Sequence, residues 1–208
     1  MLEAFWTALV ALFVTVDPLG LVPIFVALTP GLGEAERAAL ARRAVLLASL
    51  VLLLFALTGE AVLARLGIGM PAFRVAGGLF LFLLALEMVF ERRGQRRSGS
   101  AEGLADDRRG GDLAVFPIGI PLIAGPAAIT TTILVADRLG GTPAGRAAVL
   151  VAVLATMALT WAALLVAGRL ARAMGPTLIG VTSRLLGLLL GALAAQYVLD
   201  GLAQVFRG

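Results

Sequence analysis

Two proline-containing stretches interrupt apolar segments and carry the residue types best suited to bind a small polar ligand. The first runs from Asp17 to Pro23 and the second from Pro117 to Pro126. Proline lacks a backbone donor and clashes with the preceding helical turn, so each stretch should break a helix. In hydrocarbon, the freed carbonyls and amides need protein or water around them. We therefore expect each break to line a cavity.

Each break should begin a new half-helix whose first turn can bind an anion. One would start at Pro18, where Asp17 is a good N-terminal cap, and the other at Pro126. The unpaired amides and the positive dipole end favour a carboxylate. A regular helix over 113–125 would span ~18 Å and reach about the middle of a bilayer. The predicted substrate-binding residues are Asp17, Pro18, Leu19, Gly20, Gly125, Pro126, Ala127, Thr130 and Thr131.

Structural alternatives exist for the breaks and for the charged residues in the apolar segments. The prolines could only kink two helices so that they pack, and Asp17 could only cap a half-helix. As a ligand-binding group, Asp17 could bind a cation, take a proton or hold a substrate ammonium, because charges within spans are rare and usually functional. Glu60, Arg74 and Arg184 are predicted to act in gating or ion pairs. The two arginines could equally extend to the membrane interface.

The composition indicates a membrane protein and excludes several kinds of site. The chain is 60% hydrophobic and 14% charged, and its mean hydropathy is +1.01, whereas soluble domains are ~45–50% apolar and ~25% charged. It has no cysteine and no histidine, so we assign no metal site and no catalytic residue, and we do not expect an enzyme. The arginines flank apolar runs and form no single basic face, so we do not expect nucleic acid as a partner.

Six apolar segments predict an all-α integral membrane protein with six transmembrane helices, because a bilayer core needs about 20 apolar residues per helix. The segments cover residues 4–29, 44–64, 71–90, 113–136, 147–168 and 178–199. The connections after the first, third and fifth segments hold eleven arginines, and the opposite side holds four. By the positive-inside rule, the 91–112 connection lies in the cytoplasm and both termini lie in the periplasm or outside the cell.

Similar short motifs recur at a nearly constant spacing in the two halves of the chain. Arg37 and Arg146 are 109 residues apart, and Arg74 and Arg184 are 110 apart. With three spans in each half, a second copy crosses the membrane in the opposite direction, as in inverted-repeat transporters. The predicted organisation is repeat one at 1–90, a cytoplasmic linker loop at 91–112 and an inverted repeat two at 113–208, with the first helix of each repeat broken. Chance similarity between helices rich in small residues is the alternative.

Four sequence blocks resemble the MarC family of bacterial and archaeal inner-membrane proteins. The run 17–25 resembles the N-terminal signature of that family, and 73–78, 120–131 and 184–201 resemble its later blocks in the same order. The resemblance covers nearly the whole chain and implies a six-span inner-membrane protein with inverted halves. It also implies a relationship to small neutral amino acid transporters and to exporters of the lysine-exporter type. Asp17 stands where the family pattern often has asparagine, so it would add a titratable group.

The sequence thus predicts a secondary transporter of small neutral amino acids of the glycine, alanine and serine class. No nucleotide-binding motif is present, so an ion gradient would drive transport. The expected partners are a small-molecule substrate and the lipid bilayer, with no cofactor beyond a coupling proton or sodium ion. A non-transporting scaffold or regulatory protein of the inner membrane is the alternative. The sequence predicts neither the exact substrate nor the oligomeric state.

Overall fold

The computed structural model describes residues 1–90 and 113–207, which form helices joined by short turns and contain no strand. The predicted linker at 91–112 lies outside the described residues. In chain order, the elements are α1 (Leu2–Val16), α2 (Pro18–Leu28), α3 (Glu34–Arg65), α4 (Met70–Val89), η1 (Ala114–Ile123), α6 (Pro126–Leu139), α7 (Pro143–Leu165) and α8 (Ala167–Arg207).

Five to six of these helical segments are long and apolar enough to cross a bilayer. Five stand by themselves: Leu2–Leu28, Glu34–Arg65, Met70–Val89, Pro143–Leu165 and Thr177–Phe206. The sixth is a bent pair, in which η1 and α6 meet at an angle of 54°. The protein is therefore an all-α integral membrane protein, as the apolar segments predict.

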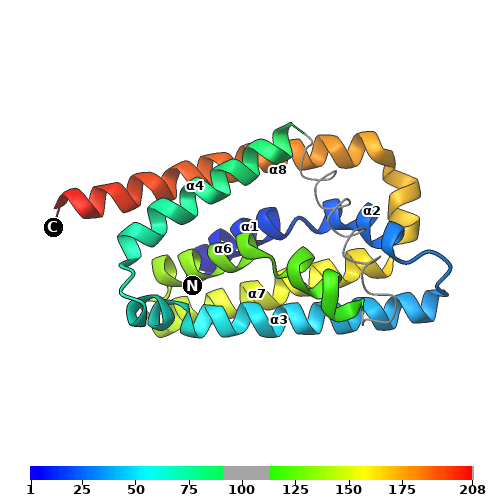
Figure 1. The fold of residues 1–208 in the computed structure, drawn as a ribbon, viewed down its shortest axis with the longest axis horizontal. Coiled ribbons are helices and arrows are strands. Elements are labelled where there is room, and N and C mark those ends of the chain that lie inside the picture. The colour runs from blue at the N-terminus through cyan, green and yellow to red at the C-terminus, as the bar shows by residue number, and fades with distance from the viewer. Residues whose placement is uncertain (91–112, 208) are drawn as a thin grey trace.

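The direction of the chain alternates from span to span (Figure 1). Helices α1 and α2 lead away from the end that carries both termini, α3 returns to it, and α4 leads away again. In the second half of the chain, η1 with α6, then α7, then α8 follow the opposite directions. These directions are what an inverted three-span repeat requires, while the division of the chain into two repeats stays a prediction.

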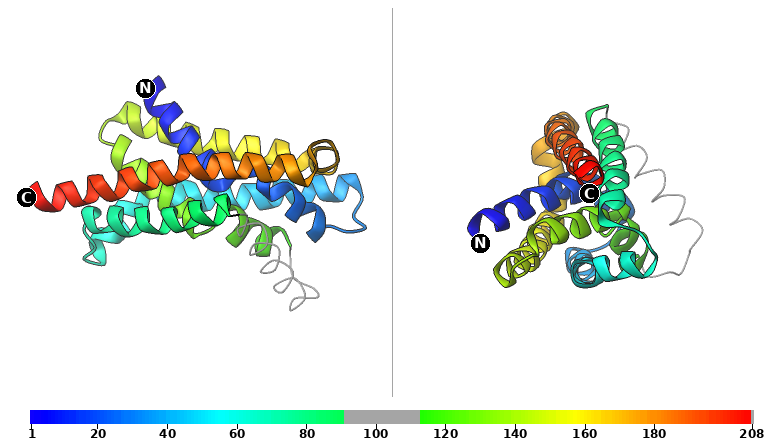
Figure 2. Two further views of the ribbon diagram at one scale, coloured as in Figure 1. Left: turned by 90° about the horizontal axis from the view of Figure 1, so that it is seen from above. Right: turned by 90° about the vertical axis from the view of Figure 1, so that its left-hand side faces the viewer.

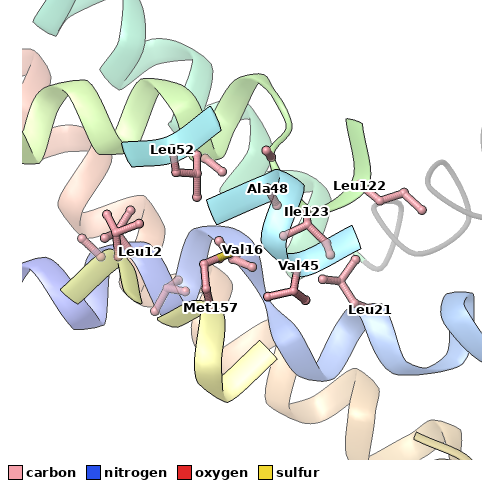
Figure 3. Packing of buried hydrophobic residues seen from close by; sticks show 14 of the residues in the cluster. Leu12, Val16, Leu21, Val45, Ala48, Leu52, Leu122, Ile123 and Met157 are labelled. Atoms are coloured by element: carbon pink, nitrogen blue, oxygen red, sulfur yellow. The ribbon is translucent and has the colours of Figure 1, made fainter. Parts of the chain in front are cut away.

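The broken helices and α7 form the centre of the bundle, and the other helices lie outside them. Figure 3 shows side chains of α1, α3, η1 and α7 meeting in one apolar cluster, with Val16 beside Met157. By contrast, α3 exposes Leu46, Leu50, Leu54 and Leu57, each by more than half of its surface. Such a leucine stripe is unfavourable in water and is suited to contact with lipid chains.

Helix α4 lies alongside the middle part of α8 (Figures 1 and 2). A Cβ added at Gly78 would come within 2.8 Å of the Ala194 carbonyl oxygen, and one at Gly187 within 3.1 Å of the Ala85 carbonyl oxygen. Each helix therefore offers a glycine to the backbone of the other. Small residues of this kind let membrane helices approach closely, so these two glycines allow α4 and α8 to pack against each other.

Candidate functional site

The first helix break occurs at a single residue, Asp17. Its backbone is left-handed, with φ 56° and ψ 66°, and its amide donates to the Phe13 carbonyl at 2.9 Å, which ends α1. The same residue caps α2, because its Oδ1 accepts a hydrogen bond from the Gly20 amide at 3.1 Å. A Cβ at position 20 would lie 2.1 Å from the Asp17 Oδ2. The glycine therefore makes room for the capping carboxylate, which is 3% exposed.

The second break extends over a longer stretch. The turns of η1 are wider than those of an α-helix, and Phe116 and Ile120 within it have extended backbones at φ −144° and −134°. The prediction of a regular helix over 113–125 is therefore wrong, because Pro117 and Pro121, which belong to the predicted break, interrupt it. A Cβ at Gly125 would lie 2.4 Å from the Pro121 carbonyl oxygen, so only glycine fits where α6 begins.

The two broken segments meet through a pair of buried threonines. The Oγ1 atoms of Thr15 and Thr131 are 3.1 Å apart, and the two residues are 1% and 0% exposed. The Thr15 hydroxyl donates to the Ala11 carbonyl at 2.7 Å. Because a hydroxyl has one proton, Thr131 is the donor to Thr15. Thr131 is a predicted site residue; Thr15 was missed, and its only signal is a hydroxyl two residues before Asp17 in an apolar segment.

The remaining predicted site residues lie around these breaks but face different neighbours. Thr130 packs its methyl group against α4, where a Cβ at Gly77 would lie 2.8 Å from it. Around the first break, Pro18 is buried and Leu19 and Gly20 are half-buried. The N-cap residue of α6, Gly125, has no side chain that could cap the helix and is buried, whereas Pro126 is exposed and Ala127 is half-buried. The amides of the first turn of α6 are thus without the side-chain cap that α2 has.

Two further features concern the interior near the breaks. A small apolar gap of about 10 Å³ separates α2 from η1, roughly the space for one water molecule. In α7, Thr156 is fully buried, and its hydroxyl has no hydrogen-bond partner within the described residues. Sequence reasoning missed Thr156, which the sequence shows only as one threonine in an apolar helix.

The predicted gating residues lie nearer the end of the bundle that carries the termini, with one exception. Arg74 in α4 pairs with Asp137 in α6, its Nε donating to Oδ2 at 2.8 Å, and both side chains are about 15% exposed. Glu60 lies at the same end in α3 and lines a cleft together with Asp137. Arg184 lies farther along on the exposed side of α8. The structure therefore brings Arg74 and Glu60 into one region, with Asp137 as the partner that sequence reasoning missed.

The other arginine pair related by the repeat spacing, Arg37 and Arg146, makes matching contacts. Arg37 donates from Nη2 to the carbonyl of Thr29, the C-terminal cap of α2, at 2.8 Å. Arg146 donates from Nε to the carbonyl of Gly140, the C-terminal cap of α6, also at 2.8 Å. Cations stabilise helix C-termini. Each half of the chain therefore stabilises the far end of its broken helix in the same way, although the sequence does not reveal these carbonyl contacts.

Known proteins are similar to this one over nearly its whole chain. A family profile described as "MarC family integral membrane protein" matches residues 2–206. The chain belongs to the MarC family. It is 33% identical over 202 residues to the UPF0056 membrane protein MJ1677 of Methanocaldococcus jannaschii, covering 97% of each chain. To the UPF0056 inner membrane protein YhgN of Escherichia coli K12 it is 32% identical, over 97% of this chain and 98% of that one.

A Bacillus subtilis member of the family, the UPF0056 membrane protein YvbG, is 33% identical over 95% of this chain and 93% of its own. No solved structure matches the chain. The names of these MarC relatives place them in a membrane, and in the inner membrane for the Escherichia coli protein. They name no substrate, so the function rests on the geometry of the site.

Proposed function

We propose that this MarC protein is a secondary transporter of small neutral amino acids, driven by a proton or sodium gradient across the inner membrane. One observation carries the proposal: two interrupted helices from opposite halves of the chain meet at the buried hydrogen bond between Thr15 and Thr131. Broken helices that face each other across inverted halves are where secondary transporters bind substrate and coupling ion.

The first turn of α6 suits the carboxylate of an amino acid. Its N-terminus has no side-chain cap, and Ala127 and Ala128 carry only methyl groups beside their amides. A helix N-terminus in this state binds an anionic oxygen group through its amides and its dipole. The small residues around it add little side-chain bulk beside these amides, which favours glycine, alanine and serine over larger substrates.

The ammonium group of the substrate would bind near the hydrogen bond between Thr15 and Thr131, at Thr131 and Asp17. Thr131 uses its proton on Thr15, so its remaining lone pair can accept a hydrogen bond from an ammonium. The Asp17 carboxylate, buried at the start of α2, adds a negative charge that an ammonium, a proton or a sodium ion would neutralise. Alternating access would come from movement of one half of the bundle against the other.

The distribution of arginines supports an orientation for this transporter. The turn between α2 and α3 and the start of α8 lie at the end opposite the termini (Figure 1). There, guanidinium nitrogens of Arg37 and Arg172 both lie within about 4 Å of a Cβ position on Gly168. The positive-inside rule assigns this end to the cytoplasm. Both termini then lie on the periplasmic or extracellular side, and the 91–112 connection on the cytoplasmic side.

Counterflow of labelled glycine and alanine in proteoliposomes tests the proposal. We expect flux in the wild type and its loss in Thr131→Val. The matched control is Thr58→Val, because the Thr58 hydroxyl bonds only within its own helix, to Leu54 at 2.8 Å, and should be dispensable. Equal flux in both variants would remove the threonine pair from the site. No flux across a panel of amino acids and gradients would favour a non-transporting scaffold or regulatory protein.

A further inference from the structure

The cleft lined by Glu60 and Asp137 lies away from the threonine pair, where α3 meets the turn between α6 and α7 at the end that carries the termini. Its volume is about 350 Å³, which falls within the size of pockets that hold small ligands. Phe55, Ile133 and Leu150 supply apolar walls, and Glu60, Asp137 and Arg146 supply charges. None of the residues proposed to bind substrate at the helix breaks lines this cleft.

The cleft is lined by two carboxylates and one guanidinium. Glu60 and Arg146 form no ion pair there within the described residues. Within the described residues, the Glu60 carboxylate has no ion-pair partner, and Arg146 uses only its Nε, on the Gly140 carbonyl at 2.8 Å. The Nη groups of Arg146 therefore remain available to an anion. Asp137 is held by Arg74 through Oδ2 alone. The cleft thus presents an unpaired guanidinium and an unpaired carboxylate to the same space.

A ligand that carries a cation and an anion close together would satisfy both groups at once. The guanidinium binds a carboxylate through two parallel N–H donors, and Glu60 accepts from an ammonium. We propose that this cleft is a second binding site, which holds the zwitterion of a small amino acid through Arg146 and Glu60 on its way to or from the helix breaks. This inference rests on the proposed transport function. In it, the cleft is the place where substrate binds at the end of the bundle that carries the termini.

The geometry of α6 links the two sites. Thr131 faces α1, while Ile133 and Asp137 of the same helix face the cleft. Six residues of helix separate Thr131 from Asp137, a distance of about 9 Å. At the wall of the cleft, Ile133 lies against α3, where a Cβ at Gly59 would be 2.6 Å from its side chain. A movement of α6 would therefore change the cleft and the threonine contact together.

Two kinds of ligand carry an ammonium group close to an anion: a free amino acid and the headgroup of an ethanolamine phospholipid. We commit to the free amino acid, because the apolar walls and the small volume match a short side chain. The experiment below separates the two sources by varying the lipid and the soluble ligand independently.

The test uses full-length protein in nanodiscs of phosphatidylcholine, with and without phosphatidylethanolamine, and equilibrium binding of labelled glycine. The variants are Glu60→Gln and Arg146→Gln. Glu3→Gln is the control for loss of a carboxylate, because Glu3 is exposed in the first turn of α1. Arg37→Gln is the control for loss of a helix-end contact, because Arg37 binds the Thr29 carbonyl at the opposite end of the molecule.

We expect glycine to bind at two separable sites in the wild type. Glu60→Gln and Arg146→Gln should each weaken one of them by at least about tenfold, Thr131→Val should weaken the other, and the controls should change neither. Unlabelled glycine should displace the label from the cleft, whereas acetate or methylamine alone should not. In proteoliposomes, Glu60→Gln should raise the apparent KM and leave the maximal rate nearly unchanged.

Unchanged glycine binding in both cleft variants, with flux intact, would overturn the second site and leave the transport proposal standing. Cleft binding that both variants abolish, in a protein without flux, would support the second site and overturn transport. If the variants alter retention of phosphatidylethanolamine and not glycine binding, the cleft is a lipid site and the proposal is overturned.

Discussion

The two helix breaks bend the chain in corresponding places by different local chemistry. At the first, one left-handed residue ends α1 and its carboxylate caps α2. At the second, prolines within η1 distort ten residues, and α6 begins at an angle of 54° with no side-chain cap. The side chain of Asp17 therefore caps the start of α2, whereas the N-cap residue of α6, Gly125, has no side chain that could do so.

This difference assigns separate tasks to the two breaks. Sequence reasoning treats both as equivalent carboxylate sites, because both have proline at the first helical position. In the structure, Asp17 already bonds the Gly20 amide, so a substrate carboxylate is better placed on α6. Under the proposed function, the first break would supply a negative charge and the second would supply backbone donors.

The largest effect on stability should come from adding a methyl group at the second break. In Gly125→Ala, the Cβ meets the Pro121 carbonyl oxygen at 2.4 Å, and a backbone atom cannot rotate away, so we expect a loss of about 3 kcal/mol. Gly20→Ala meets a side chain that can move, and should lose about 1 kcal/mol as the cap is displaced. Gly141→Ala is the control, since nothing lies within 4 Å of that position. Thermal unfolding in detergent measures all three, and equal losses at positions 20 and 125 would contradict the comparison.

Replacing Asp17 by alanine and by glycine separates the stability contributed by its side-chain cap from the cost of its left-handed backbone. Asp17→Ala removes the cap and keeps the left-handed φ of 56°, so it should lose about 2 kcal/mol. Asp17→Gly also removes the cap but adopts that backbone freely, and should lose only a few tenths of a kcal/mol. Both variants should lose the dependence of flux on the ion gradient. Equal unfolding temperatures for the two would mean that the left-handed backbone contributes nothing.

The hydrogen bond between the breaks should give a measurable but smaller coupling. A double-mutant cycle with Thr15→Val and Thr131→Val should yield about 0.6 kcal/mol, the average for hydrogen bonds between membrane helices. Thr58→Val combined with Thr131→Val should be additive, because Thr58 bonds only Leu54 in its own helix. A coupling near zero for the first pair would show that the breaks do not interact through these hydroxyls.

The smallest effect on stability should come from Thr156→Val. The Thr156 hydroxyl is buried without a hydrogen-bond partner in the described part of the chain, so removing it should change the free energy of unfolding by less than about 0.5 kcal/mol, with stabilisation the expected sign. Reversible unfolding and glycine counterflow measured on the same variant separate two roles. Flux lost without loss of stability would extend the substrate site from the breaks to α7.

Local features of the fold and site were predictable, and long-range pairings were not. Asp17 before Pro18 predicts a helix cap, and the hydrogen bond to Gly20 confirms it. The apolar segments likewise predict the membrane spans. In contrast, Thr15 and Thr131 are 116 residues apart, and Arg74 and Asp137 are 63 apart, so no local pattern indicates that they meet. The prolines predict the interruption of the chain within η1, but not the wide turns or the extended backbone of Phe116 and Ile120.

The sequence by itself determined the spans, their breaks and the absence of histidine and cysteine chemistry, because hydropathy and the missing proline amide act within a few residues of chain. The tertiary structure decided which groups meet: α6 and α1 through two hydroxyls, and α4 and α6 through Arg74 and Asp137. It also placed Glu60 and Arg146 in the lining of one cleft. It also decided which helix end is capped by a side chain. These contacts depend on how the helices pack in three dimensions, and small residues such as Gly78 and Gly187 set that packing by letting backbones approach.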